Sequence, residues 1–287
     1  MELLKVQELN KSYPSFHLED VSFSLEKGYI MGFIGMNGAG KTTTLKSILN
    51  MVHADSGYIE IMGKEFKSHE LELKQDIGVM LGDMDFYVKK RVKTLTEVVK
   101  RFYTHWDDTI YATYCDRFNI DEEKRLCELS TGMRTKYALT LALSHQARLF
   151  ILDEPTSGLD PAARDELLEI FQQLVEDGQK SVLFSTHITS DLEKYADFIT
   201  YIHEGKIITS TTKDEFIDSY AIIKGTLPQL TDELKELMIS YKKNDFGFSG
   251  LMKTNDHSHD IESDYTSERP TLEDIMIYYA KRGRTHA

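Results

Sequence analysis

The sequence predicts an α/β fold in which a mixed, largely parallel sheet is covered by helices and followed by a smaller C-terminal extension. Short apolar runs, typical of buried strands, alternate with stretches of helical periodicity along the first 220 residues. A glycine-rich segment at residues 35–42 separates one of these strands from one of these helices. With 287 residues, 41% of them hydrophobic and 28% charged, the chain suits one large domain with an appendage.

The spacing of apolar residues places the N-terminal elements. Apolar and polar residues alternate at 21–25, as in a half-buried strand, and residues 29–35 form a continuous apolar run, as in a buried central strand. Apolar residues recur at helical spacing over 45–52, and residues 58–61 and 77–81 are typical of further short strands. The glycine-rich segment is therefore predicted to join a strand to a helix.

The middle of the chain changes character before the strand and helix alternation resumes. The segment 94–145 has no comparable strand runs, so we expect a mostly helical subdomain over about 83–145. A buried strand at 147–155 follows, then a helix at 161–178 with proline near its start and glycine past its end, and then a strand at 181–186. No internal repeat is visible.

We place the first domain at residues 1–220 and a C-terminal extension at 221–287. The extension is expected to begin with a short strand and to continue as a helix over 231–243. Residues 255–268 are polar and poor in large apolar side chains, which predicts a loop. Thr271 and Asp274 then resemble a capping box that opens an apolar helix.

Charge and cysteine content limit the classes of partner and compartment. The formal net charge is −13, from 47 acidic and 34 basic side chains, and this balance disfavours nucleic acid as the main partner. The two cysteines, Cys115 and Cys127, have no spacing typical of a disulfide framework or a metal site, which favours a reducing cytosol. We see no secretory signal and no apolar run of about 18 residues. A membrane role would therefore require another chain.

Residues 35–42, GMNGAGKT, fit the phosphate-binding pattern G-x-x-x-x-G-K-[ST]. Backbone N–H groups of such a loop surround phosphate oxygens, and the following helix N-terminus adds positive potential. Lys41 would reach the β- and γ-phosphates, and the Thr42 hydroxyl would ligate Mg²⁺. The alternative is a glycine-rich turn with an incidental lysine, which the flanking strand and helix disfavour. The residues expected to contact the nucleotide here are Asn37, Gly38, Ala39, Gly40, Lys41, Thr42 and Thr43.

A second element, residues 149–154 (LFILDE), delivers two carboxylates at the end of a buried strand. Asp153 is placed to hold Mg²⁺ through water, and Glu154 is placed to orient and deprotonate the attacking water. A general base of this kind contributes about 10²–10⁴ in rate. The alternative is that one or both acids only cap the turn into Pro155.

The order of further motifs resembles the ABC ATPases. Residues 129–134 (LSTGMR) resemble the signature motif of that family, residues 157–160 (SGLD) its D-loop, and residues 185–187 (STH) its switch histidine. An aromatic residue at the N-terminal side matches the ring that stacks on adenine in the family. The residues that carry the resemblance, which covers most of residues 1–220, are Tyr13, Lys41, Ser130, Glu154, Asp160 and His187.

This resemblance implies a mechanism in which two cassettes pack head to tail with ATP between them. Ser130 and the backbone of Gly132 would contact the γ-phosphate bound to the partner subunit, where a helix N-terminus favours negative charge. His187 would hold the γ-phosphate and help to fix Glu154 and the water. ATP would stabilise the closed dimer, and hydrolysis would release it.

Two positions depart from the family pattern. The signature motif usually has two central glycines, and here Thr131 stands at the first, whereas Ser130 and Gly132 remain. After the strand at 77–81 the family usually has glutamine, and here Gly82 is followed by Asp83. Asp83 is therefore a candidate substitute contact to Mg²⁺ or water.

The chain has one phosphate loop and one signature motif, and Ser130 follows Lys41 by 89 residues. Soluble translation factors of the family carry two cassettes, and its DNA-repair members separate the motifs by a long coiled coil. This comparison favours a transporter ATPase, held at the cytoplasmic face of a bacterial membrane by a permease on a separate chain. A second ATP-binding subunit, identical or different, would complete the dimer. The alternatives are a soluble ABC ATPase that remodels a macromolecular complex, and a weakly catalytic regulatory subunit.

Within the family the pattern resembles the bacterial group of bacitracin-resistance and Ytr-type exporters, and within that group the ATPases that export phenol-soluble modulins and related amphipathic peptides. The ending ERPTLEDIMIYYAK is like the C-terminal helix of the group. That helix would either pack on its own domain or contact the second ATPase subunit. His257 and His259 lack a second ligand cluster, so a solvated loop is favoured there over a metal site.

Overall fold

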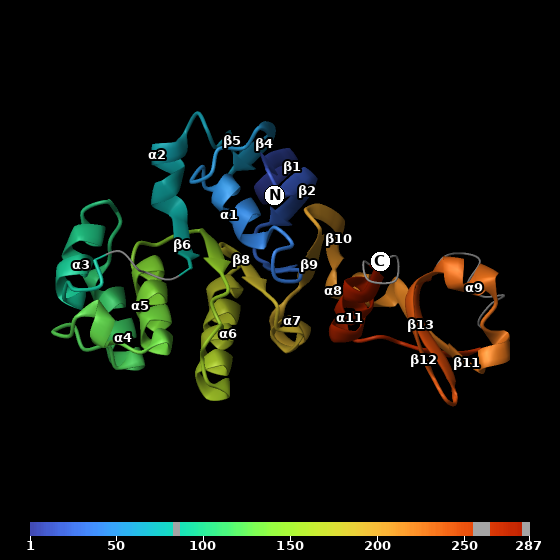
Figure 1. Ribbon diagram of the computed structural model, residues 1–287. Coiled ribbons are helices and arrows are strands. Elements are labelled where there is room, and N and C mark those ends of the chain that lie inside the picture. The colour runs from blue at the N-terminus through green and yellow to red at the C-terminus, as the bar shows by residue number, and fades with distance from the viewer. Residues whose placement is uncertain (83–86, 255–264, 283–287) are drawn as a thin grey trace. The chain divides into compact units, whose positions relative to one another are not determined.

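The computed structural model describes residues 1–82, 87–254 and 265–282, and it divides into two compact units, Met1–Ile208 and Thr209–Ala287 (Figure 1). The boundary that we expected after residue 220 falls inside the second unit. The reason is that the ring of Phe216 lies edge-on to Tyr220, whose hydroxyl lies 3.0 Å from that of Tyr279. These aromatic contacts join the segment before residue 220 to the C-terminal elements.

The first unit begins with an antiparallel sheet whose strand order is β2-β1-β4-β5. Apolar residues of β1 and β2 are buried on one side, as the alternation at 21–25 predicts. The long β1–β2 hairpin turns at Pro14 and Ser15, so that Tyr13 and Phe16 are paired across its end. The strands are β1 (Glu2–Tyr13), β2 (Phe16–Glu26), β4 (Ser56–Ile61) and β5 (Lys64–Glu65).

A second sheet of the first unit has the strand order β10-β9-β3-β8-β7-β6. The neighbouring pairs β9–β3, β3–β8, β8–β7 and β7–β6 are all parallel, which confirms the α/β fold. Every residue of β3, β7 and β8 is buried, because this sheet is covered on both faces. The strands are β3 (Ile30–Ile34), β6 (Ile77–Leu81), β7 (Leu149–Asp153), β8 (Ser181–Thr186), β9 (Phe198–His203) and β10 (Lys206–Thr212).

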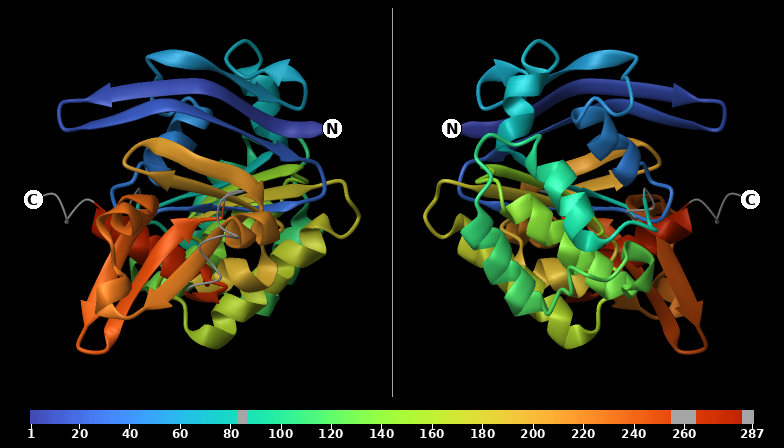
Figure 2. Two further views of the ribbon diagram at one scale, coloured as in Figure 1. Left: turned by 90° about the vertical axis from the view of Figure 1, so that its right-hand side faces the viewer. Right: turned by 90° about the vertical axis from the view of Figure 1, so that its left-hand side faces the viewer.

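Figure 2 shows β1 and β2 as a layer on one side of the parallel strands, with α6 on the other side. Between β6 and β7 the described residues form helices, and their one strand-like contact is an isolated bridge between Arg91 and Arg125. The helices of this unit are α1 (Lys41–Ile48), α2 (Glu70–Leu73), α3 (Val92–Lys100), α4 (Asp108–Phe118), α5 (Thr131–Leu143), α6 (Pro161–Val175) and α7 (Thr189–Tyr195), with 3₁₀ turns at Lys74–Asp76 and Leu126–Glu128.

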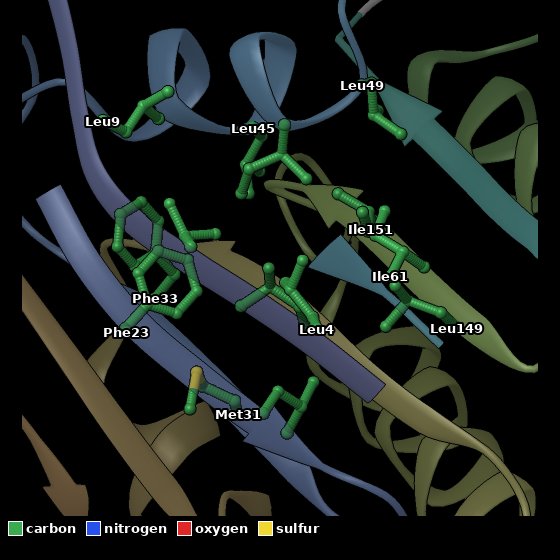
Figure 3. Packing of buried hydrophobic residues seen from close by; sticks show 14 of the residues in the cluster. Leu4, Leu9, Phe23, Met31, Phe33, Leu45, Leu49, Ile61, Leu149 and Ile151 are labelled. Carbon is green, nitrogen blue, oxygen red and sulfur yellow. The ribbon is translucent and has the colours of Figure 1, made fainter. Parts of the chain in front are cut away.

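The core of the first unit lies between the antiparallel sheet and the parallel sheet. Leu4 of β1, Phe33 of β3 and Ile151 of β7 are each 0% exposed and belong to one cluster. Phe23 of β2 stacks on Phe33 with ring centroids 5.5 Å apart. Figure 3 shows Leu45 of α1 entering the same cluster, so the helix after the glycine-rich loop is attached to both sheets.

Buried hydroxyl groups connect the helical part between β6 and β7. Thr96 of α3 has its hydroxyl oxygen 2.8 Å from that of Tyr111 on α4 and 3.0 Å from that of Tyr137 on α5. Because these groups are buried, their mutual hydrogen bonds avoid the cost of unsatisfied polar atoms and fix the three helices to one another.

The described residues of the second unit form a four-stranded sheet, of strand order β12-β13-β11-β14, and three helices. The helix predicted over 231–243 is wrong in its second half, because α9 ends at Leu237 and Met238–Asn244 forms strand β12. Pairing with β13 buries Met238 and Ser240 alternately, which overrides the local helical preference. The elements are α8 (Lys213–Asp218), β11 (Tyr220–Gly225), a 3₁₀ turn (Leu227–Gln229), α9 (Asp232–Leu237), β12 (Met238–Asn244), β13 (Gly247–Lys253), β14 (Thr266–Glu268) and α11 (Leu272–Arg282).

The predicted loop at 255–268 is corrected at its end, because Thr266–Glu268 forms β14 and pairs with β11. Residues 255–264, which include His257 and His259, lie outside the described residues. The capping box at the start of α11 is confirmed: the Thr271 N–H donates to Asp274 Oδ2 at 3.1 Å, and the Asp274 N–H donates to the Thr271 hydroxyl oxygen at 3.1 Å.

Helix α11 packs on β12 and β13 of its own unit. Leu272, Ile275, Met276, Tyr278 and Tyr279 are buried, whereas Ile277 is 37% exposed. This burial favours the first of the two interpretations of the C-terminal helix, in which it stabilises its own domain. Among the described residues, no helix has the length and apolarity needed to span a bilayer.

His145 makes the stability of the first unit depend on pH. Its ring stacks on Tyr103 with centroids 3.7 Å apart, Nδ1 lies 3.3 Å from the Gln75 carbonyl oxygen, and burial lowers the pKa of His145 from 6.5 to about 4. The His145 ring therefore binds a proton at higher pH in the unfolded chain than in the folded chain. Stability is lost as pH falls below about 6.5. We expect His145 to account for about 2 kcal/mol of lost unfolding free energy between pH 7 and pH 5.

Urea denaturation of His145→Phe at both pH values measures this contribution. The variant keeps a ring against Tyr103. Between pH 7 and pH 5 it should lose about 2 kcal/mol less unfolding free energy than the natural protein. His105→Phe, at an exposed position, is the matched control and should keep the natural pH dependence. An unchanged pH dependence in His145→Phe would contradict the assignment.

Candidate functional site

The glycine-rich loop connects β3 to α1, as the sequence predicts. Gly38 and Gly40 have φ of +81° and +113°, a region that residues with a Cβ rarely adopt. A Cβ on Gly35 would lie 2.5 Å from the carbonyl oxygen of Ile202, and a Cβ on Gly40 would lie 2.8 Å from Cζ of Phe16. Backbone conformation therefore favours glycine at positions 38 and 40, and close packing favours it at positions 35 and 40.

Lys41 is the first residue of α1, and its side chain is only 6% exposed. Its ammonium donates to the Gly35 carbonyl at 2.8 Å and lies 3.5 Å from Glu154 Oε1. The lysine therefore turns back over the loop that precedes it. A phosphate group bound in the loop would meet the ammonium, the loop N–H groups and the N-terminus of α1 together.

Asp153, at the end of β7, accepts two hydroxyl hydrogen bonds. The Thr42 hydroxyl donates to Oδ2 at 2.7 Å, and the Ser185 hydroxyl donates to Oδ1 at 2.5 Å. A hydroxyl and a carboxylate side by side are hard oxygen ligands, which fit Mg²⁺ that is completed by water and phosphate oxygens. Among the described residues no group of three or more His, Cys, Asp and Glu side chains could hold a metal by itself.

Glu154 lies at the centre of the site, immediately after β7. Its φ is +51°, a left-handed conformation that costs a non-glycine residue about 1–3 kcal/mol. The Glu154 N–H is held by the Ser185 carbonyl at 3.1 Å and the Ser185 hydroxyl at 3.0 Å. The carboxylate lies 3.5 Å from Lys41 Nζ on one side and 2.8 Å from His187 Nδ1 on the other.

His187 follows β8 and is half exposed, at 46% of its side-chain area. Because a carboxylate only accepts hydrogen bonds, His187 Nδ1 carries the proton that faces Glu154 Oε2. The Nε2 atom, which is unprotonated in the neutral ring and carries a hydrogen in the charged ring, is then available to another group.

An open cleft of about 710 Å³ lies over the glycine-rich loop. Tyr13 is not among the described residues that line it, and Lys11 Nζ lies 5.6 Å from the centre of the Tyr13 ring. Phe16, the residue paired with Tyr13 across the hairpin, lines the cleft instead, and the sequence analysis missed it. The lining residues are Ser15, Phe16, Asn37, Gly38, Gly40, Lys41, Thr42, Thr43, Glu154, Ser157 and His187.

Ser130 and Gly132 stand at the start of α5, outside the residues that line the cleft. The Ser130 hydroxyl caps α5 by accepting from the Met133 N–H at 3.2 Å. A Cβ on Gly132 would lie 3.2 Å from Leu159 Cδ2, so Leu159 leaves little room for a side chain there. The signature residues and the segment 157–160 are therefore neighbours within one chain, whereas Ser130 is not brought to the phosphate loop of the same chain.

Asp160 also lies outside the cleft lining and begins α6. Its carboxylate accepts from the N–H groups of Ala162 and Ala163 at 3.1 and 3.0 Å. The bond from Ala163 is the largest of the causes that lower the pKa of Asp160 below its ordinary value. The side chain thus works as a helix cap in this chain. Ala39, in the loop, is buried.

A cavity of about 220 Å³ adjoins the cleft and shares Glu154 and Ser157 with it. Gly82 and Arg134 also line this cavity. Gly82 has φ of +59°, and no atom lies within 4 Å of the position that its Cβ would take, so the site of the family's usual glutamine is open. Asp83, the proposed substitute, lies outside the described residues.

The comparisons with known proteins agree with this geometry. A family model described as ABC transporter matches residues 18–157. The chain is 33% identical over 223 residues to the ABC transporter ATP-binding protein YtrB of Bacillus subtilis (strain 168), with 77% of this chain and 76% of the relative covered. It is also 33% identical over 209 residues to the bacitracin transport ATP-binding protein BcrA of Bacillus licheniformis, with 72% and 68% covered.

The fold also matches a solved structure of an ATP-binding subunit of an ABC transporter. That structure has a TM-score of 0.66 and 26% sequence identity, and the match covers 74% of this chain and 91% of the other. The similarity therefore includes both the sequence and the arrangement of the elements that build the site.

Gly40→Ala tests whether the loop conformation is needed for nucleotide binding. The substitution places a Cβ against Phe16 at a left-handed position, so we expect unfolding free energy to fall by roughly 1–3 kcal/mol and ATP affinity to fall with it. Urea denaturation and a titration with ATP measure the two effects. Gly63→Ala is the matched control, because Gly63 has φ of +77° but nothing within 4 Å of its Cβ position. Unchanged ATP affinity in Gly40→Ala would contradict the assigned loop.

Proposed function

This chain belongs to the ABC transporter family as an ATP-binding subunit, and from that premise we propose that it hydrolyses ATP to drive a membrane exporter. Members of this family are ATPases. The observation that carries the catalytic part of the proposal is the position of Glu154 between Lys41 and His187 at the end of a buried strand. Each step of the proposed cycle can be assigned to particular residues around this group.

ATP binding is assigned to the cleft over the glycine-rich loop. The loop N–H groups and Lys41 would hold the phosphates, since both are positive and lie at the N-terminus of α1. Phe16 lines the same cleft and offers an aromatic face to adenine, whereas Tyr13 would have to reach across from the end of the hairpin. Thr42 and Asp153 would hold Mg²⁺, which neutralises phosphate charge when bound.

Hydrolysis is assigned to Glu154 as the general base. Its carboxylate would accept the proton of the attacking water, while Lys41 would stabilise negative charge on the phosphate. His187 donates to the carboxylate from Nδ1 and so holds it in one orientation. The opposite edge of the histidine ring is then available to the γ-phosphate.

The positions of the signature residues support the proposal that two such subunits close on ATP. Ser130 and Gly132 are at the N-terminus of α5, which favours negative charge, but they do not line the cleft of their own chain. We assign them to the γ-phosphate bound by a second ATP-binding subunit, identical or different, with Asp160 and its loop at the same interface. ATP would then hold two chains together, and its hydrolysis would release them.

We further propose that a permease on a separate chain holds this subunit at the cytoplasmic face of the membrane. Similarity to YtrB and to the bacitracin transport protein BcrA supports an exporter. On this basis the transported compounds would be antimicrobials or amphipathic peptides. The permease would recognise them, because every residue assigned here serves ATP.

Glu154→Gln should separate ATP binding from hydrolysis. The amide keeps the shape of the side chain but cannot accept the proton, so we expect hydrolysis to fall by about 10²–10⁴ while ATP affinity is retained. With ATP present the variant should elute as a stable dimer in size-exclusion chromatography. Glu169→Gln, at an exposed position of α6, is the control and should behave like the natural protein. Unchanged hydrolysis in Glu154→Gln would show that another group is the base.

Purification from the native host tests the transporter part. After membrane fractionation and a high-salt wash, the tagged chain should retain a protein with several membrane spans in near-equal amount. If the tagged chain instead stays in the soluble fraction or binds ribosomes, the permease proposal is wrong, and a soluble ATPase that remodels a complex takes its place. ATP hydrolysis measured on the same sample is independent of this outcome.

A further inference from the structure

Asp191 of α7 is a buried carboxylate, 3% exposed, that contacts both sides of the loop between β7 and α6. Its Oδ2 accepts from the Thr156 hydroxyl at 2.7 Å, and its Oδ1 lies 3.9 Å from Nη1 of Arg164. Thr156 precedes the loop 157–160, and Arg164 follows it on α6. One carboxylate therefore joins the turn after β7, the start of α6 and the helix α7.

The turn that Asp191 holds is the turn that carries Glu154. The Ser157 N–H donates to the Glu154 carbonyl at 3.1 Å, so Thr156 lies inside a closed turn with Glu154 at its first position. Glu154 has φ of +51°, which persists only where the surroundings impose it. Ser185 imposes it from β8 through two hydrogen bonds to the Glu154 N–H, and Thr156 is held from the other side by Asp191.

Helix α7 is itself fixed against the parallel sheet. Leu192, next to Asp191, is fully buried, and a Cβ on Gly32 of β3 would lie only 2.0 Å from Leu192 Cδ2. The helix therefore approaches β3 as closely as a glycine allows. His187 comes just before this helix, so Asp191 is on a fixed support that also carries the partner of Glu154.

Asp191 is buried beside polar and charged groups. Burial raises the pKa of Asp191, and the Thr156 hydrogen bond and the charge of Arg164 oppose that rise. Glu154 and His187 also act on Asp191 electrostatically, with opposite signs. A buried charge is a costly way to stabilise a fold when apolar residues could fill the space. The contacts of Asp191 instead lie at both ends of the loop 157–160, which adjoins Glu154 and His187.

We propose that Asp191 is a positioning residue for ATP hydrolysis, which acts through Thr156 and Arg164 to hold the Glu154 carboxylate against His187. This inference rests on the proposed function, in which Glu154 is the general base. Asp191 does not touch the nucleotide cleft, so its loss leaves the residues assigned to ATP binding in place.

The test compares steady-state hydrolysis by Asp191→Ala, Thr156→Val and the double variant. Because small misplacements of a reacting group are costly, each single variant should lower kcat by about 10- to 100-fold while KM for ATP changes less than about twofold. The double variant should be no slower than the slower single variant, because both remove one interaction. Thr156→Val removes one hydroxyl and keeps the side-chain shape, so it decides the question if Asp191→Ala does not fold.

Asp165→Asn is the matched control, because Asp165 also links α6 to α7, through Lys194 Nζ at 2.6 Å, but at a half-exposed position. It should keep kcat within about twofold. The inference is overturned if both Asp191 and Thr156 variants keep the natural kcat, or if kcat falls only together with melting temperature and ATP affinity. Glu154→Gln measured in parallel separates a failure of this inference from a failure of the proposed function. An active Glu154→Gln protein would overturn the proposed function itself.

Discussion

The carboxyl ends of β3, β7 and β8 meet at one edge of the parallel sheet, and the rest of the site depends on that meeting. Thr42 follows β3, Asp153 ends β7, and Ser185 lies near the end of β8. Hydroxyl hydrogen bonds of 2.7 and 2.5 Å join all three at the Asp153 carboxylate. Parallel strands with both faces covered bring these residues together, because their connections must return to the same edge.

Glu154 shows how this edge is made reactive. Its left-handed backbone is held by Ser185, and its side chain is directed between Lys41 and His187. The buried strands around Glu154 stabilise the fold and so offset the cost of this unfavourable conformation.

The second unit has an apolar core of its own. Its helix α11 buries its apolar face on β12 and β13, and the Tyr220 and Tyr279 hydroxyls meet at 3.0 Å inside it. The apolar ending of the sequence therefore has an explanation within its own unit. The sequence of β12 predicts a helix, because its residues alternate in burial only once β13 lies beside them.

The sequence by itself determined the features that depend on neighbours along the chain. The glycine-rich loop, the strand before it and the helix after it, the cap at Thr271 and the acidic pair at the end of β7 all follow from local spacing, because backbone conformation and helix capping act over a few residues. Only the tertiary structure decided which distant residues meet. It placed Phe16 rather than Tyr13 in the cleft wall, turned Met238–Asn244 into a strand, and joined Asp191 to Thr156, since packing across the sheet carries no local signal.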